Sequence, residues 1–281
     1  MRSIRVLLAL VLAVGATAAC ADRAREAFTP EPTGCFFGGG SDPLHLTSTQ
    51  TFHAATIAAV GHRDGMDERA VAVAIATAFQ ESGLDNLDYG DRDSLGLFQQ
   101  RPSVGWGSEE EILDPVYASF KFYEKLRRID GWEDMRIGDA AQAVQVSAYP
   151  EEYHKWEDDA FTVASALAGD QEAGLRCMVT EDRERSTETA TLAEAFEYEW
   201  GAAVSAVDDR TVAIEAADGP AGWHRASWAV AKSFEWDIAS VEYAGRVWEP
   251  GDEAWSEPEA ETVEASDTDE SLVVITLNAE P

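Results

Sequence analysis

The sequence predicts a mostly α-helical domain at residues 45–170, followed by a small α+β domain at residues 189–281. Three observations lead to this prediction. Apolar runs between helix-capping residues fill residues 45–170, where no pattern typical of strands appears. Alternating apolar and polar residues, which indicate strands, begin near residue 211. Between the two regions, residues 171–188 are rich in charged side chains and are interpreted as a linker.

Helix-start residues divide the first region into five expected helices. Ser, Thr and Asp are the side chains that best accept the free N–H groups of a first helical turn. The expected N-terminal caps include Thr47, Asp67, Asp114 and Asp139. The expected helices cover residues 52–60, 67–82, 114–126, 140–149 and 151–168. A loop rich in Gly, Asp and Ser is expected at residues 85–107.

The second region contains both helical and strand-like patterns of apolar residues. Helices are expected at residues 190–207 and 223–234, and strands at residues 211–217, 241–248 and 272–277. Residues 251–271 are acidic and poor in apolar side chains, and are expected to be a mobile loop. Five tryptophans could either bind sugar or form the aromatic core of a small domain, and the second interpretation is favoured. They are Trp223, Trp228, Trp236, Trp248 and Trp255.

The charge balance narrows the classes of function. The chain of 281 residues has 21 Lys and Arg against 53 Asp and Glu, which gives a formal net charge of −32. Nucleic-acid binding needs a basic surface, so this class is excluded. Hydrophobic residues make up 45% of the chain, which is enough for a substantial core.

Residues 1–20 have the pattern of a signal peptide. Arg2 and Arg5 are followed by the apolar run Val6–Val14, which is too short to span a bilayer. The segment Thr-Ala-Ala-Cys that ends at Cys20 resembles a bacterial lipobox, which implies lipidation of Cys20 and a membrane anchor. The alternative is simple cleavage near residues 16–21 and release. Either way we expect an extracytoplasmic protein, with residues 21–44 as a linker.

The cysteine count fits this location. Lipidation of Cys20 would leave Cys35 and Cys177 as an even pair on either side of the helical region. In an oxidising compartment such a pair is expected to form a disulfide. Chain-entropy reasoning gives this bridge a stabilisation of roughly 4–5 kcal/mol. Two free thiols are the alternative.

The helix expected at residues 67–82 carries the first candidate for chemistry. Its run Val71–Phe79 is apolar on every side, which indicates a buried helix. Glu81 falls in the last turn, where both burial and the negative end of the helix disfavour an ionised carboxylate. Its pKa is therefore expected to be raised, as a general acid requires. The alternative is a solvated Glu at a frayed helix end.

Three short motifs give this helix end a context. Glu81-Ser82 is followed after 15 residues by Gly-Leu-Phe-Gln at residues 96–99, and later by Ala148-Tyr149. This order resembles that of the soluble lytic transglycosylases and goose-type lysozymes. The run from Tyr89 to Gly107 is similar to a lysozyme-like domain common in actinobacterial secreted proteins. The resemblance covers roughly residues 45–168 and implies a lysozyme-like fold for the helical domain.

The resemblance implies a cell-wall enzyme. It assigns Glu81 as the catalytic acid and Ser82, Gln99 and Tyr149 as groups that contact substrate or Glu81. The implied substrate is the MurNAc–GlcNAc β-1,4 bond of peptidoglycan glycan strands, cleaved to a 1,6-anhydro product. Neither a cofactor nor a metal is expected, because the histidines and the acidic loop lack metal-binding spacing.

Two departures leave alternatives open. Goose-type lysozymes keep a Gly-Asp-Arg segment before the Gly-Leu motif, so Asp91 or Asp93 could act as a second carboxylate in a hydrolytic muramidase. The favoured alternative is that both cap turns and pair with Arg92. Pro150 stands where the family usually has Asn after Ala-Tyr. This second departure favours a non-catalytic wall-binding or scaffolding lipoprotein that keeps the fold.

Four more residues near these motifs could contribute to a sugar site. Gly90 and Gly96 would let the backbone approach a sugar closely. Trp106 and Tyr153 could stack on sugar rings or belong to the core.

Overall fold

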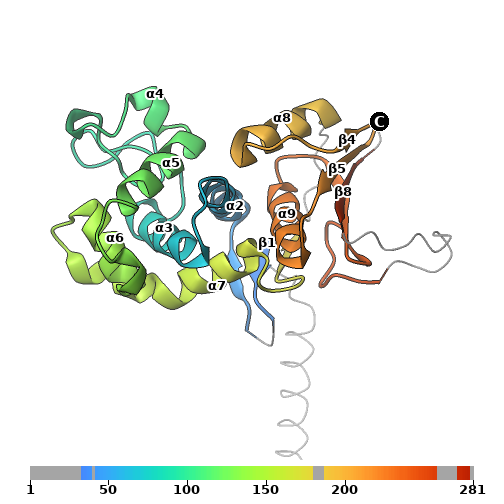
Figure 1. Cartoon of the computed structure of the whole chain (residues 1–281), viewed down its shortest axis with the longest axis horizontal. Coiled ribbons are helices and arrows are strands. Elements are labelled where there is room, and N and C mark those ends of the chain that lie inside the picture. The colour runs from blue at the N-terminus through green and yellow to red at the C-terminus, as the bar shows by residue number, and fades with distance from the viewer. Residues whose placement is uncertain (1–32, 40–41, 180–186, 258–270, 279–281) are drawn as a thin grey trace, which may run out of the picture. The chain divides into compact units, whose positions relative to one another are not determined.

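The computed structural model of the chain describes residues 33–39, 42–179, 187–257 and 271–278 (Figure 1). The expected signal peptide, the lipidation site Cys20 and residues 258–270 of the expected mobile loop lie outside the described residues. The described part is a mixed α+β fold with eight α-helices and two small antiparallel sheets. No helix in this part is both long enough and apolar enough to cross a membrane.

The helical region contains six α-helices and most of the expected helix starts. They are α2 (Ser48–Arg63), α3 (Glu68–Ser82), α4 (Glu109–Ile112), α5 (Pro115–Leu126), α6 (Ile137–Gln145) and α7 (Glu157–Ala168). Thr47 caps α2 as expected, in a capping box with Gln50, and the Asp67 carboxylate accepts from the N–H of Ala70. Asp114 caps α5, with Pro115 in its first turn. These ends were predictable because each depends only on residues within one turn.

A three-stranded sheet brings together the two ends of this region, and it was not predicted from the sequence. Its order is β2 (Leu44–Leu46), β1 (Gly34–Phe37) and β3 (Leu175–Met178), all antiparallel. Cys35 and Cys177 are direct partners in the β1–β3 register and form the expected disulfide. The strands are only three or four residues long, too short to show an alternating pattern. The stretch 21–44, interpreted as a linker, therefore includes β1 and the start of β2.

The C-terminal region is a five-stranded antiparallel sheet with two helices. The strand order is β4 (Ala206–Val207), β5 (Thr211–Glu215), β8 (Leu272–Leu277), β6 (Ile238–Tyr243) and β7 (Arg246–Trp248). The helices are α8 (Thr189–Trp200) and α9 (Gly219–Lys232). Figure 1 shows α9 between α2 and the strands of this sheet, and α9 contacts both.

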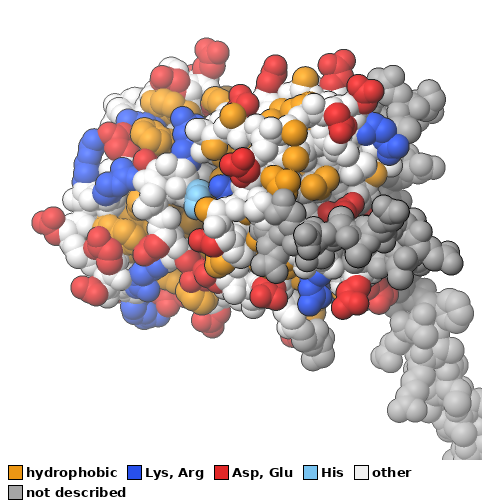
Figure 2. Space-filling model, turned by 45° about the vertical axis from the view of Figure 1, so that its right-hand side comes forward, with side chains coloured by type: hydrophobic (Ala, Val, Ile, Leu, Met, Phe, Trp, Pro, Cys, Tyr) orange, Lys and Arg blue, Asp and Glu red, His pale blue; other side chains and the backbone are white. Residues whose placement is uncertain are grey.

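Most of the tryptophans of this region belong to its core. Trp223, Trp228, Trp248 and Trp255 are all buried, and Trp236 packs against the same core. This arrangement supports the core interpretation over a surface that binds sugar. Figure 2 shows acidic side chains spread over the visible face rather than gathered in one patch.

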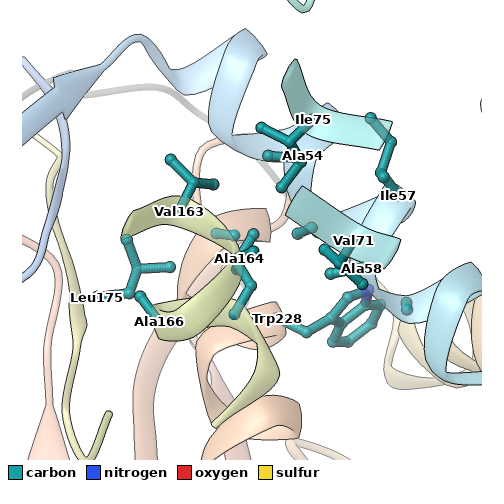
Figure 3. Close-up of a cluster of buried hydrophobic side chains, with 14 of the residues drawn as sticks. Ala54, Ile57, Ala58, Val71, Ile75, Val163, Ala164, Ala166, Leu175 and Trp228 are labelled. Atoms are coloured by element: carbon teal, nitrogen blue, oxygen red, sulfur yellow. The ribbon is translucent and has the colours of Figure 1, made fainter. Parts of the chain in front are cut away.

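One continuous apolar core connects the two regions. Figure 3 shows part of it, with side chains from α2, α3 and α7 beside Leu175 of β3 and Trp228 of α9. Residues 33–281 accordingly form one compact unit. The boundary at residues 171–188 remains a prediction about chain organisation.

Several element ends differ from the sequence analysis. Helix α6 begins at Ile137 with Arg136 as its cap residue, and Asp139 lies in the first turn, where it bonds His154. It ends at Gln145 because Val146 takes a left-handed conformation, with φ of 54°. The expected helix 151–168 starts as a 3-10 helix, η3 (Pro150–Trp156), before α7.

The C-terminal region shows two such differences. Helix α8 stops at Trp200, where Gly201 adopts a left-handed conformation. The expected strand 241–248 is a hairpin, because Ala244 and Gly245 both have positive φ and turn the chain.

Candidate active site

The last turn of α3 places Glu81 at the edge of the helical core. From Ala70 to Phe79 every residue of this helix is buried, whereas Glu81 and Ser82 are only partly buried. Gly83 ends the helix in a left-handed conformation with φ of 68°. The Glu81 side chain is therefore partly shielded from water without being fully buried, which suits a group that must exchange protons with a ligand.

Two neutral side chains hydrogen-bond to the Glu81 carboxyl. The hydroxyl of Tyr153 donates to Oε1 of Glu81, and the amide of Gln145 donates to the same carboxyl group. Burial raises the pKa of Glu81, and these two hydrogen bonds offset part of the rise because they favour the charged form. Burial and the bond to Glu81 also raise the pKa of Tyr153, so its hydroxyl remains a donor.

Neither Tyr153 nor Gln145 was assigned this role from the sequence. Tyr153 belongs to the 3-10 helix η3 (Pro150–Trp156), and its side chain is buried. Its hydroxyl also forms a hydrogen bond with Ser147. Gln145 is the last residue of α6, and its Nε2 donates to the carbonyl of Phe98 over 2.7 Å. One amide thus connects the helix that carries Glu81 to the Gly-Leu-Phe-Gln segment. A polar residue just before a helix end and a Tyr after Pro150 were the only available signals, and neither is specific.

Tyr149, which the resemblance placed at the site, is not the tyrosine that hydrogen-bonds to Glu81. Its residue surface is 72% exposed, and its backbone N–H donates to Oγ of Ser147 over 3.2 Å. It therefore lies one turn from Tyr153 along the same segment. Pro150 directly after it begins η3, and this 3-10 turn brings Tyr153 to the carboxyl group.

Ser82 binds the motif loop to the helix end. Its Oγ lies 2.7 Å from the carbonyl of Leu97 and 3.1 Å from the carbonyl of Ala78. The 15-residue separation in sequence becomes a direct contact in the fold. The structure thus gives Ser82 a contact that positions residues 96–99 beside Glu81.

Gln99 faces its own loop. Its Nε2 donates to the carbonyls of Gly96 and Tyr89, over 3.2 and 3.3 Å. A Cβ at Gly90 would lie 1.9 Å from Oε1 of Gln99, and one at Gly96 would lie 2.7 Å from the carbonyl of Ile112. Packing within the protein therefore requires both glycines. Gln99 organises the loop that borders Glu81, and its described contacts do not include Glu81 itself.

The two candidate second carboxylates differ sharply. Asp93 accepts from Nε of Arg101 over 2.7 Å and from the N–H of Ser103 over 2.8 Å. The bonds from Ser103 and Arg101 hold the pKa of Asp93 well below its usual range. Asp91 lies 3.7 Å from Arg92, with 92% of its side chain exposed. Asp93 thus stabilises the loop through its hydrogen bonds with Arg101 and Ser103, while Asp91 is exposed to solvent beside Arg92.

Two tryptophans near these motifs pack within the protein. Trp156 stacks on Phe79 with 5.1 Å between ring centroids, and its indole N–H donates to Oε1 of Gln80 over 3.0 Å. Trp106 is partly buried under Nζ of Lys125, which lies 4.4 Å from the ring centroid. Among the described residues, no three His, Cys, Asp or Glu side chains are grouped so that they could hold a metal ion.

No family model matches the chain, and no curated protein matches it in sequence.

Proposed function

We propose that this protein is a peptidoglycan-cleaving envelope enzyme in which Glu81 is the general acid. Its substrate would be the MurNAc–GlcNAc β-1,4 bond, cleaved as by a lytic transglycosylase. One observation carries the proposal: a partly buried carboxyl with a raised pKa, held by two neutral donors at the end of the core helix. Such a group stays protonated at higher pH than an ordinary Glu and can protonate a leaving oxygen.

The surroundings of Glu81 suit both halves of such a reaction. In the first step the carboxyl gives its proton to the glycosidic oxygen, and the C1–O bond breaks. Tyr153 and Gln145 then stabilise the carboxylate that remains, without the fixed positive charge that would keep it ionised beforehand. In the second step this carboxylate takes the proton of the muramic C6 hydroxyl as the oxygen bonds to C1. The product is a 1,6-anhydro end, and Glu81 is protonated again.

The loop carboxylates favour this route over hydrolysis. A hydrolase needs a second carboxylate that is free to act on water or on the sugar. Asp93 is engaged by Arg101 and Ser103, and Asp91 is almost fully exposed beside Arg92. Neither has the environment of a base held against a substrate. A transglycosylase does not require one, because the hydroxyl of the substrate itself attacks.

Product analysis tests the proposal directly. The purified mature protein would be incubated with peptidoglycan sacculi, and the released fragments analysed by mass spectrometry. We expect anhydro-muropeptides, lighter by one water than hydrolytic fragments. Glu81→Gln should reduce release by roughly 10²–10⁴-fold while the variant keeps its circular dichroism spectrum. Full release by Glu81→Gln would refute the role of Glu81, and reducing ends would indicate a muramidase.

A non-catalytic wall-binding or scaffolding lipoprotein is the second candidate. The exposed position of Tyr149 beside Pro150 is the observation that favours it, since the family's Tyr position is not used as expected. This candidate predicts that the wild-type protein sediments with sacculi but releases no fragments. Both candidates include an envelope location, with an anchor at Cys20, and the Cys35–Cys177 disulfide fits an oxidising compartment.

A further inference from the structure

A cavity of about 340 Å³ lies between the three-stranded sheet and the segment that follows β7. Its walls include Phe36 of β1, Arg176 of β3, Arg246 of β7, and Glu253 and Trp255 of the following segment. Its volume falls at the lower end of the range for small-molecule sites. Nothing in the proposed reaction at Glu81 uses this cavity.

The wall that follows β7 is fixed on both sides. The indole N–H of Trp255 donates to the carbonyl of Leu175 over 2.9 Å, which attaches the segment to β3. One residue later, Ser256 and Val247 exchange backbone hydrogen bonds of 2.9 Å each, which attaches it to β7. The cavity is therefore lined by elements from both regions of the chain, and the segment after β7 is held in place by hydrogen bonds on both sides.

Arg176 is held in a defined orientation on the cavity wall. It is the direct partner of Phe36 in the β1–β3 register, and its guanidinium carbon lies 4.2 Å from the centroid of the Phe36 ring. On the other side of the same ring, His45 lies 5.0 Å away between centroids. A guanidinium held over an aromatic ring is fixed in place, and its remaining N–H groups can donate to an acceptor in the cavity. Its Nη1 is buried and finds no hydrogen-bond acceptor among the described residues.

The charge around the cavity is unusual for this chain. The formal net charge of the sequence is −32, yet two arginines line one small cavity. Within the described residues, the ion pairs involve neither Arg176 nor Arg246. Glu253 is the carboxylate of the lining, and it repels a dianion more strongly than a monoanion. A planar monoanion satisfies these conditions better than a phosphate.

The geometry points to a binding site for a carboxylate that carries a small apolar group. Arg176 and Arg246 would bind the carboxylate, because the planar guanidinium matches it in two parallel hydrogen bonds. Phe36 and Trp255 would contact the apolar part. The carboxylate could belong to the C-terminus of a peptide or to a free small acid, and the shared chemistry is the same.

Calorimetric titration of the full mature protein tests this site. The probes are N-acetylalanine, its amide, N-acetyl-Ala-Ala, propionate and inorganic phosphate. We expect N-acetylalanine to bind and its amide not to bind. Arg176→Gln and Arg246→Gln should each weaken binding roughly tenfold, the effect of losing one charged hydrogen bond. Glu253→Gln should strengthen it, since a repulsive charge is removed.

Arg128→Gln is the matched control, because Arg128 lies just after α5, has 71% of its side chain exposed, and is not among the residues that line the cavity. It should bind N-acetylalanine as the wild type does. Tighter binding of N-acetyl-Ala-Ala than of propionate would assign a peptide terminus, and equal binding would assign a free acid. The proposal is wrong if the amide binds as well as the acid, if phosphate binds best, if nothing binds, or if Arg128→Gln loses as much as the two cavity variants.

Discussion

Glu199 and Glu81 are both shielded from water, but the side chains that hydrogen-bond to them differ between the two regions of the chain. Glu199 of α8 accepts from Nζ of Lys232 over 2.7 Å and from the indole N–H of Trp228 over 2.6 Å. Thr56 of α2 donates to the same carboxylate over 3.1 Å and also accepts from Lys232. Among the described residues, the donors to Glu81 are the neutral side chains of Tyr153 and Gln145, and the Glu81 side chain is only partly buried.

The difference separates a structural carboxylate from a reactive one. Lys232 is fully buried, so water does not solvate its ammonium group. Glu199 stabilises that group instead. That pair joins α2, α8 and α9 across the two regions. At Glu81 both protonation states can be stabilised, since a hydroxyl and an amide bind a carboxylate and tolerate a carboxylic acid. The same residue type thus holds the fold together in one place and can move a proton in the other.

Removing the cation at Glu199 should have the largest effect on stability. Lys232→Met leaves a buried carboxylate without its partner, so we expect a loss of about 3–5 kcal/mol in the free energy of unfolding. Urea denaturation measures this. The double variant Glu199→Gln with Lys232→Met removes both charges and should recover most of the loss. If the single variant were as stable as the wild type, Glu199 and Lys232 would not form the structural pair described here.

Removing one neutral donor at Glu81 should affect activity rather than stability. Tyr153→Phe is expected to lower kcat/KM on sacculi roughly tenfold, the effect of one hydrogen bond to a charged group. Because this bond lowers the pKa of Glu81, its loss should move the basic limb of the pH–rate profile to higher pH. Tyr149→Phe, at an exposed site, should leave that limb in place. A limb that moves with Tyr149→Phe and not with Tyr153→Phe would reverse the assignment of the two tyrosines.

The loop carboxylates should matter less than Glu81. Asp93→Asn weakens the bonds to Arg101 and Ser103, so we expect a lower melting temperature and a loss of activity of less than roughly tenfold. Asp91→Asn, at a side chain that is 92% exposed, should change neither. An Asp91→Asn variant as inactive as Glu81→Gln would identify Asp91 as a second catalytic carboxylate and favour hydrolysis.

The pH dependence of stability gives the smallest expected signal. The pKa of Glu81 is raised in the folded state, so the folded protein holds a proton that the unfolded chain has released. Stability contributed by this proton is present below the pKa of the unfolded chain and is lost as pH rises through the folded pKa. Glu81→Gln does not titrate, so its stability relative to the wild type should increase with pH over that interval. Thermal melts across acidic and neutral pH measure the slope, and a decrease would contradict the raised pKa.

Local signals in the sequence predicted the features that depend on local chemistry. Glu81 at a glycine-terminated helix end follows from residues within two turns, and the Cys35–Cys177 pair follows from a count of three cysteines. The contact of Tyr153 with Glu81 could not be predicted, because it requires the left-handed turn at Val146 and the 3-10 helix after it. The Asp93–Arg101 pair depends in the same way on how the loop folds back.

The hydrogen bond from Ser82 to Leu97 has a consequence for how such a site can change over evolution. This hydrogen bond holds residues 96–99 at the end of α3. Their position therefore does not depend on the length of the chain between Ser82 and Leu97. Insertions at exposed positions of this loop, such as Asp91 and Arg92, would therefore leave the contact with Ser82 in place, since lengthening a surface loop costs little free energy. The spacing of 15 positions from Glu81 to Gly96 is thus one solution among several. A serine or threonine after the glutamate is the feature that related chains with longer or shorter loops would need to retain.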